Sequence, residues 1–77
     1  MDNTIDQEIR YLHKNIGAKV QRRRIIKGLT QLELANAIGH SSTTIISQAE
    51  IGEKKHFNIE QLYKISKILE CNITEFF

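Results

Sequence analysis

The first part of the chain carries apolar side chains at a helical spacing. They recur every three or four positions: Ile5, Ile9, Leu12, Ile16 and Val20. This spacing aligns them on one face of an α-helix and predicts a single helix from Ile5 to about Lys27. Two features favour a break instead. Asn15 is a good N-cap for a separate helix, and Gly17 inside a helix costs about 1 kcal/mol relative to alanine.

The starts of the later helices follow one pattern of capping residues. Thr30 is an N-cap residue, and Glu33 three positions later completes a capping box. Leu29 and Leu34 flank this pair as a hydrophobic staple. A helix is therefore predicted to begin at Gln31.

The same pattern occurs twice more: Asn58 with Gln61, and Asn72 with Glu75. It predicts helices that begin near Ile59 and Ile73. Helix ends are indicated by glycines that adopt the left-handed conformation of a C-cap: Gly28, Gly39 and Gly52. The fourth helix has no such glycine and is predicted to end at residues 70–72.

These elements make an all-α chain of about five helices joined by short turns, since proline and alternating strand patterns are lacking. With 77 residues, 40% of them hydrophobic, the chain has room for one small core. Residues 1–15 are predicted as an N-terminal helical extension, continuous with or preceding the first helix of a domain at residues 16–77. The residues expected in the core are Val20, Ile26, Leu34, Ile38, Leu62, Ile65, Ile68 and Leu69.

Charge is distributed unevenly, although the net charge is only +2. Seven of the eleven basic residues lie between Glu8 and Glu33 with no acidic residue among them: Arg10, Lys14, Lys19, Arg22, Arg23, Arg24 and Lys27. Such a run is either an ordinary solvated face or a surface for a polyanion. The single cysteine, Cys71, excludes an intramolecular disulfide, and no signal-peptide or membrane-spanning pattern is present, so a cytoplasmic location is expected.

The second and third predicted helices form a helix-turn-helix arrangement. A helix from Gln31 to Ile38 is followed by a short glycine turn and by a helix that ends at Gly52. So short a link makes the two helices cross steeply, which leaves one of them prominent on the surface. Residues 41–47, SSTTIIS, are poor helix formers, so packing rather than local propensity must impose this third helix.

Three segments of the chain together resemble the helix-turn-helix domain of phage repressors and Cro, the XRE family. They read IGAKVQRRRIIKGLTQLELANAIG, IISQAEIG and NIEQLYKISKILECNITEFF, within residues 16–77. The markers are Gly28-Leu29-Thr30-Gln31, Leu34-Ala35, Ser47-x-x-Glu50-x-Gly52 and Leu62-x-x-Ile65; together they are specific, whereas each alone is weak. The resemblance implies a five-helix DNA-binding domain in which the second helix spans the DNA backbone. Its third helix, about residues 43–51, would enter the major groove.

The residue types at these positions suit contacts with DNA. The start of the second helix, at Thr30 and Gln31, presents free backbone amides to a phosphate, and Gln31 is also a candidate brace for the third helix. The polar residues predicted to face the groove are Ser42, Thr43, Thr44, Ser47 and Gln48. Gln48 is the strongest candidate for a base contact, because its amide can pair with adenine. For Thr43 and Ser47 a merely solvated surface is the alternative.

Compared with the common family form, one extra residue lies between positions 39 and 50, which leaves two registers for the third helix. Counting back from position 50 places Ile46 and Ala49 inward and Ser42 at the N-cap. The residues then facing DNA are Thr43, Thr44 and Gln48. Counting forward from position 39 places Ile45 inward, and the residues then facing DNA are Ser42, Thr43 and Ser47. The first register is preferred because its two inward residues are three positions apart.

The segment EKKHF, residues 53–57, resembles the family loop that runs along the phosphates. Lys54, Lys55 and His56 are therefore predicted to contact the DNA backbone without reading sequence. The resemblance also implies an ion pair between Arg24 and Glu50, which removes Arg24 from the DNA contacts. The remaining candidates for phosphate neighbours are Lys19 and Arg22.

The preferred functional interpretation is a sequence-specific transcriptional regulator that binds double-stranded DNA, either a repressor or a controller of its own operon. The alternatives are an antitoxin-type autoregulator and a protein-interaction module that has lost DNA binding. No enzyme activity, cofactor or metal site is predicted, because no nucleophile has an adjacent base. The candidate metal ligands are also scattered: His13, His40, His56 and Cys71.

A homodimer is expected, because one such domain touches few base pairs whereas a two-fold dimer reads both halves of a palindromic operator. Its surface is predicted at the C-terminal helix, with a possible contribution from the N-terminal extension. The residues concerned are Ile73, Phe76 and Phe77, and Ile5, Ile9 and Leu12. The alternative is that both segments simply cover the core of one chain.

Overall fold

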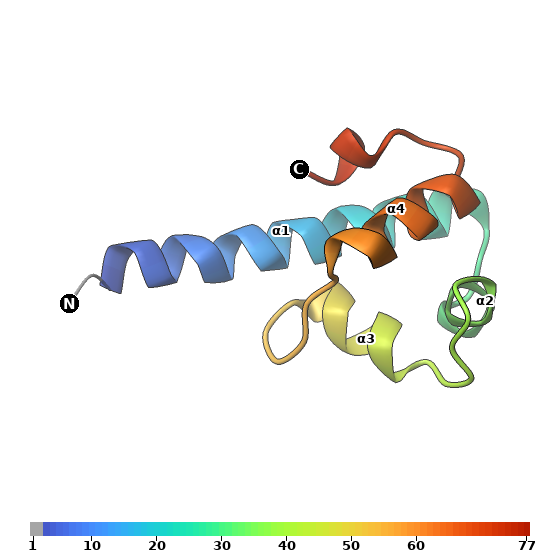
Figure 1. Cartoon of the computed structure of the whole chain (residues 1–77), viewed down its shortest axis with the longest axis horizontal. Coiled ribbons are helices and arrows are strands. Elements are labelled where there is room, and N and C mark those ends of the chain that lie inside the picture. Colours follow the sequence, from blue (N-terminus) through green and yellow to red (C-terminus); the bar gives the residue numbers. More distant parts are fainter. Residues whose placement is uncertain (1–2) are drawn as a thin grey trace.

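The computed structural model describes residues 3–77 as an all-helical fold (Figure 1). Its elements are α1 (Asn3–Lys27), α2 (Gln31–Ala37), α3 (Thr44–Ile51), α4 (Ile59–Ile68) and the 3₁₀ helix η1 (Ile73–Phe76). The all-α class is confirmed, but the predicted count of five helices becomes four α-helices and one short 3₁₀ turn. The first two residues of the predicted extension 1–15 lie outside the described residues.

The long first helix is continuous, so the predicted single helix is confirmed and the alternative break at Asn15 is wrong. Gly17 lies where α1 meets α3. A Cβ atom added there would lie 2.3 Å from the carbonyl oxygen of Ala49 and 2.5 Å from that of Glu50. Glycine is therefore required at this position by the neighbouring backbone, and its cost in helix propensity is offset by close packing of the two helices.

The capping boxes predicted for α2 and α4 are present. Thr30 Oγ1 accepts a hydrogen bond from the backbone N–H of Glu33 at 3.0 Å, and the Glu33 carboxylate accepts one from the Thr30 N–H at 2.8 Å. Asn58 and Gln61 make the same reciprocal pair at 2.7 and 2.9 Å. Both helices begin at the predicted residues, because these bonds satisfy backbone donors that the first helical turn leaves free.

The predicted capping box at the last helix is wrong. The Asn72 side chain accepts from the backbone N–H of Thr74 at 3.0 Å, two residues away, which starts a 3₁₀ turn instead of an α-helix. Glu75 forms an ion pair with Arg23 of α1 rather than returning a bond to Asn72. A tertiary contact thus takes the side chain that the local pattern had assigned to the cap.

α4 ends at Ile68, two residues before the stop predicted at residues 70–72, and a non-glycine residue makes the turn that follows. Glu70 adopts the left-handed conformation with φ of 57°, and the N–H of Cys71 donates to the carbonyl of Ser66 at 2.9 Å. This bond satisfies a carbonyl in the last turn of the helix. Glu70 also pairs with Lys27, at the end of α1.

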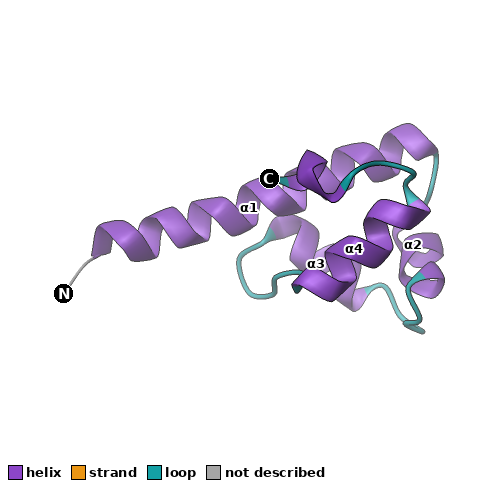
Figure 2. Ribbon diagram, turned by 45° about the horizontal axis from the view of Figure 1, so that its top comes forward, coloured by secondary structure: helices purple, strands orange, loops and turns teal. Residues whose placement is uncertain are grey.

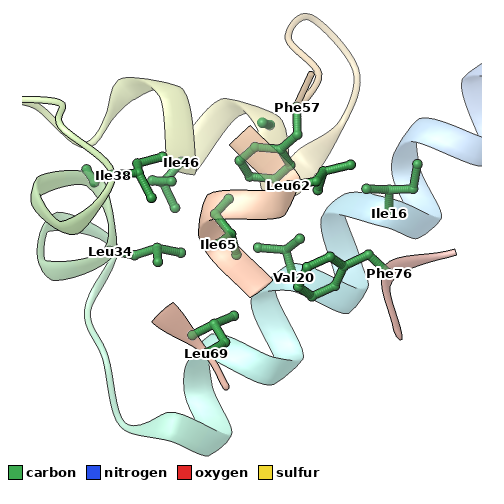
Figure 3. Packing of buried hydrophobic residues seen from close by; sticks show 12 residues of the cluster. Ile16, Val20, Leu34, Ile38, Ile46, Phe57, Leu62, Ile65, Leu69 and Phe76 are labelled. Carbon is green, nitrogen blue, oxygen red and sulfur yellow. The ribbon is translucent and has the colours of Figure 1, made fainter. Parts of the chain in front are cut away.

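The hydrophobic core joins all the elements (Figure 3). Its buried residues are Ile16, Val20, Leu34, Ala35, Ile38, Ile46, Ala49, Phe57, Leu62, Ile65, Leu69 and Phe76. Ile68 is half-buried against this cluster, but the prediction for Ile26 is wrong, because its side chain is 72% exposed. Ile26 follows Val20 by six residues, about 240° around the helix, and Arg24 occupies the inward position near the end of α1.

The α1 helix extends well beyond the other elements at its N-terminal end (Figures 1 and 2). In contrast, the C-terminal segment folds back over α1, and Phe76 is fully buried in the core. None of the helices in residues 3–77 has an apolar stretch long enough to cross a bilayer.

Candidate nucleic-acid interface

The third helix has the register preferred from the sequence. Ile46 and Ala49 are buried, with exposed fractions of 0% and 1%. Ile45 is only half-buried and packs at the edge of the core. The alternative register, with Ile45 inward, is wrong. The sheet-favouring isoleucines are thus accommodated in a helix because burial against α1 and α2 outweighs their local preference.

The predicted N-cap of α3 is wrong by one residue. Thr43 occupies the cap position, already in helical conformation, and its side chain makes no capping bond. The hydroxyl of Ser42 instead donates to Oγ1 of Thr44 at 3.4 Å. The helix therefore begins with backbone amides that no side chain satisfies, which leaves them open to solvent or to an anionic ligand.

The polar residues of α3 lie on the side away from the core. Ser42 and Thr44 are exposed, whereas Thr43, Ser47 and Gln48 are half-buried. The Ser47 hydroxyl donates to the carbonyl of Thr44 at 3.3 Å, but the side-chain amide of Gln48 makes no hydrogen bond within the described residues. The structure thus places Ser42 and Thr43 immediately before α3, and Thr44, Ser47 and Gln48 on one face of the helix.

Gln48 lies beside a shallow hollow at the C-terminal end of α3. The hollow has a volume of about 240 Å³ and is lined by Gln48, Ile51, Glu53 and Lys54. Its lining combines an amide that can donate and accept, an apolar side chain, a cation and the Glu53 carboxylate, which pairs with Lys14 of α1. The first three are group types that contact base edges, thymine methyls and phosphates.

The Glu50 carboxylate anchors α3 to both α1 and α2. It accepts hydrogen bonds from Arg24 Nε at 2.7 Å and Arg24 Nη2 at 3.2 Å. Gln31 Nε2 donates to the same carboxylate at 3.0 Å, and Arg24 Nη1 donates to the carbonyl of Leu29 at 2.8 Å. The Arg24–Glu50 pair and the bracing hydrogen bond from Gln31 are therefore both present. Together they fix the position of α3 relative to α1 and α2.

The loop after α3 exposes two lysines and holds one histidine. Lys54 and Lys55 are exposed and form no ion pair within residues 3–77. The His56 ring stacks on His13 of α1, with centroids 3.6 Å apart and an angle of 8° between the rings. Partial burial lowers the pKa of His13, and the charge of the neighbouring His56 lowers it further. Sequence reasoning missed this stack, because the histidines are far apart in the chain and neither lies in a recognisable motif.

Comparison with protein families identifies the arrangement. A helix-turn-helix family model, HTH_3, matches residues 20–76, about three quarters of the chain. The chain belongs to the HTH_3 helix-turn-helix family. This family comprises XRE and Cro/C1-type DNA-binding domains, so the protein is a DNA-binding regulator of the XRE type. No curated protein matches the chain closely enough to count as a relative.

Most of the basic run in this helix-turn-helix protein is engaged within the fold. Besides the Arg24–Glu50 pair, three cations of α1 meet acidic partners: Arg23 with Glu75, Lys27 with Glu70 and Lys14 with Glu53. The hydrogen bond from Lys27 and its charge lower the pKa of Glu70. Lys19 Nζ donates to the backbone oxygen of Phe77 at 2.8 Å. The run therefore ties α1 to the later elements rather than presenting one basic face.

The predicted phosphate neighbours on α1 lie away from α3. Lys19, Arg22 and Phe77 line the same hollow between α1 and η1, and η1 lies on the opposite side of α1 from α3 (Figure 1). The exposed lysines of the loop thus stand next to α3, whereas these two cations do not.

Within residues 3–77, no three histidine, cysteine or acidic side chains gather where they could hold a metal ion. The half-buried Cys71 thiol is free, and burial raises its pKa. The HTH_3 family is a family of DNA-binding domains rather than of enzymes.

Proposed function

We propose that the protein is a cytoplasmic, sequence-specific transcriptional regulator, a repressor or a controller of its own operon, that binds a palindromic operator as a homodimer. The observation that carries the proposal is that α3 has one buried, anchored face and one polar face directed away from the core. Its inner residues, Ile46, Ala49 and Glu50, are buried and anchored, while its opposite face presents hydroxyls and an unpaired amide. This arrangement suits a rigid helix that enters the major groove.

Base reading is assigned to the exposed face of α3. The Gln48 amide would pair with the N6 and N7 atoms of adenine. Thr43, Thr44 and Ser47 offer hydroxyls that donate or accept, and the threonine methyl groups suit the thymine methyl. Ser42 lies at the entry end, where its small side chain lets the helix start approach the DNA.

Phosphate contacts are assigned to the two ends of the helix-turn-helix. At the start of α2, the Thr30 N–H already donates to the Glu33 carboxylate, so the backbone amide of Gln31 is the donor assigned to a phosphate, while the Gln31 side chain remains on Glu50. After α3, Lys54 and Lys55 project from the loop and His56 is held against α1. These groups would fix the height and orientation of the domain on the duplex.

Binding to a library of short DNA duplexes should weaken steeply as salt rises. Each phosphate neutralised releases condensed counterions, so the log of the binding constant should fall linearly with the log of salt concentration, with a slope of about −0.9 per phosphate contact. Fluorescence anisotropy over a salt series measures this slope. Salt-independent binding, or none at low salt, would favour an interaction module over a DNA-binding regulator.

Gln48→Ala and Lys55→Ala should affect DNA binding in different ways. Gln48→Ala should cost about 1–3 kcal/mol of binding free energy and relax preference at one base position. Lys55→Ala should weaken all sequences alike and lower the salt slope by about one contact. Selection of bound sequences from random DNA with each variant compares them, and identical changes in the two profiles would contradict this division of roles. The natural chain's consensus would also show whether the operator is palindromic.

A further inference from the structure

The apolar face by which α1 packs into the core continues onto the part of the helix that projects beyond the rest of the molecule (Figures 1 and 2). Ile5, Ile9 and Leu12 are 51%, 47% and 46% exposed, whereas Ile16 is buried in the core. These four residues are separated by four, three and four positions, which is the spacing of a seam between two helices. The segment thus presents an apolar face suited to another helix.

Charges along this segment change sign from its outer to its inner part. Asp6 and Glu8 lie in the outer part, and Arg10 and Lys14 lie nearer the core. Lys14 pairs with Glu53 of its own chain at 3.3 Å, while Arg10 forms no ion pair within the described residues. A parallel pair of such segments would place like charges side by side. Arg10 and Lys14 project away from the apolar face, so they act on a second helix through the longer-range field rather than by direct contact. An antiparallel pair still brings the acidic end of each segment level with the basic end of the other.

We propose that this face binds the same segment of a second copy of the chain, in an antiparallel helix pair. The proposal rests on the proposed function, because a palindromic operator holds two copies on one duplex. The contact is self-complementary: each copy supplies the same apolar residues and the two ends of the same charge gradient, as a two-fold axis requires.

The C-terminal end offers a smaller apolar surface for pairing. Phe76 is fully buried in the core of its own chain, and Ile73 is half-buried against the same core. Of the three C-terminal residues predicted for the dimer surface, only Phe77 is exposed, at 54%. The extension therefore takes the principal role, and the C-terminal segment covers the core.

The pair formed by the extensions is weak in free solution. Three half-exposed side chains on each copy bury far less than the roughly 1,200 Å² of total surface typical of stable complexes. On a palindromic duplex, however, the DNA holds the two copies close together and so raises their effective concentration. Even a weak contact between them then produces cooperative binding. Dimerisation is thereby coupled to occupancy of both half-sites.

Sedimentation equilibrium of the full chain without DNA, up to millimolar concentration, tests the contact. The natural chain should show a monomer–dimer equilibrium, and Ile9→Lys should weaken it about tenfold or more, because it places a charge in the seam. The matched control is Ile25→Lys, which changes a 60% exposed isoleucine of the same helix outside the extension and should self-associate like the natural chain. A natural chain that stays monomeric, or equal association of Ile9→Lys, would overturn the proposal.

The charge gradient gives a test of orientation. Arg10→Glu should weaken self-association, as should the double variant Asp6→Lys with Glu8→Lys, and mixing the two should restore a heterodimer. If each variant associates with itself as strongly as the natural chain, the antiparallel orientation is wrong. Binding to a duplex carrying one half-site separates the two hypotheses: its absence in every chain contradicts the proposed function, whereas intact half-site binding with no effect of Ile9→Lys on association contradicts only the helix pair.

Discussion

Replacing Glu50 with alanine is expected to lower the free energy of unfolding by about 3–5 kcal/mol, because it removes one partner of a buried ion pair. The carboxylate accepts three hydrogen bonds, two from Arg24 and one from Gln31. Its side chain is 2% exposed and that of Arg24 is 10% exposed. Without Glu50, a buried guanidinium would keep its charge and lose its partner, and α3 would lose its link to α1 and α2. Urea denaturation followed by circular dichroism measures the loss.

A matched control for Glu50→Ala is Glu75→Ala. Glu75 also pairs with an arginine of α1, Arg23, but both side chains are partly exposed, at 46% and 39%. Solvent screens such a pair, so its removal should cost no more than about 1 kcal/mol. Equal losses in the two variants would show that the buried pair contributes no more than a surface ion pair. Since small domains are stable by only about 5–15 kcal/mol, the predicted difference is easily resolved.

Gly17→Ala is expected to destabilise the protein by about 1–3 kcal/mol, although alanine is the better helix former. The added Cβ would lie 2.3 and 2.5 Å from two carbonyl oxygens of the α3 backbone. Neither oxygen can move without moving α3, so the two helices must separate. Helix propensity alone predicts the opposite sign, a gain of about 1 kcal/mol. The sign of the change in unfolding free energy therefore decides between the two effects.

The propensity effect can be measured separately at the next residue. Ala18 is exposed on α1, so Ala18→Gly should cost about 1 kcal/mol through helix propensity alone. If Gly17→Ala instead stabilises the protein by a similar amount, the close approach of α1 and α3 would be contradicted. A second readout is DNA binding, which Gly17→Ala should weaken by displacing α3 while Ala18→Gly leaves it unchanged.

The features predicted correctly from sequence depend on neighbouring residues along the chain. Thr30 with Glu33 and Asn58 with Gln61 cap their helices as expected, because these bonds span only three residues. The register of α3 was also predictable, because the buried Ile46 and Ala49 share one helix face. The polar face of α3, and with it the candidate base contacts, follows from that register.

The predictions that were wrong concern residues with more than one available partner. Asn72 and Glu75 have the spacing of a capping box, but Arg23 takes the Glu75 carboxylate. Ile26 is as apolar as any core residue, yet Arg24 is the residue of that turn that faces inward. In the first case Arg23 of α1 takes the carboxylate, and in the second the distant Glu50 holds Arg24 inward. Both local patterns are real, and a residue distant in sequence decides the outcome.

By itself, the sequence determined an all-helical protein, the starts of α2, α3 and α4 to within one residue, and membership of a DNA-binding family. These follow from caps, periodicity and motif spacing, which act over a few residues. Only the tertiary structure decided that the basic run of α1 is largely neutralised by acids from later elements, that His56 stacks on His13, and that Gly17 faces the backbone of α3. Such contacts depend on how α1 is rotated against α3 and η1, and that rotation is set by packing of the whole core rather than by any one segment.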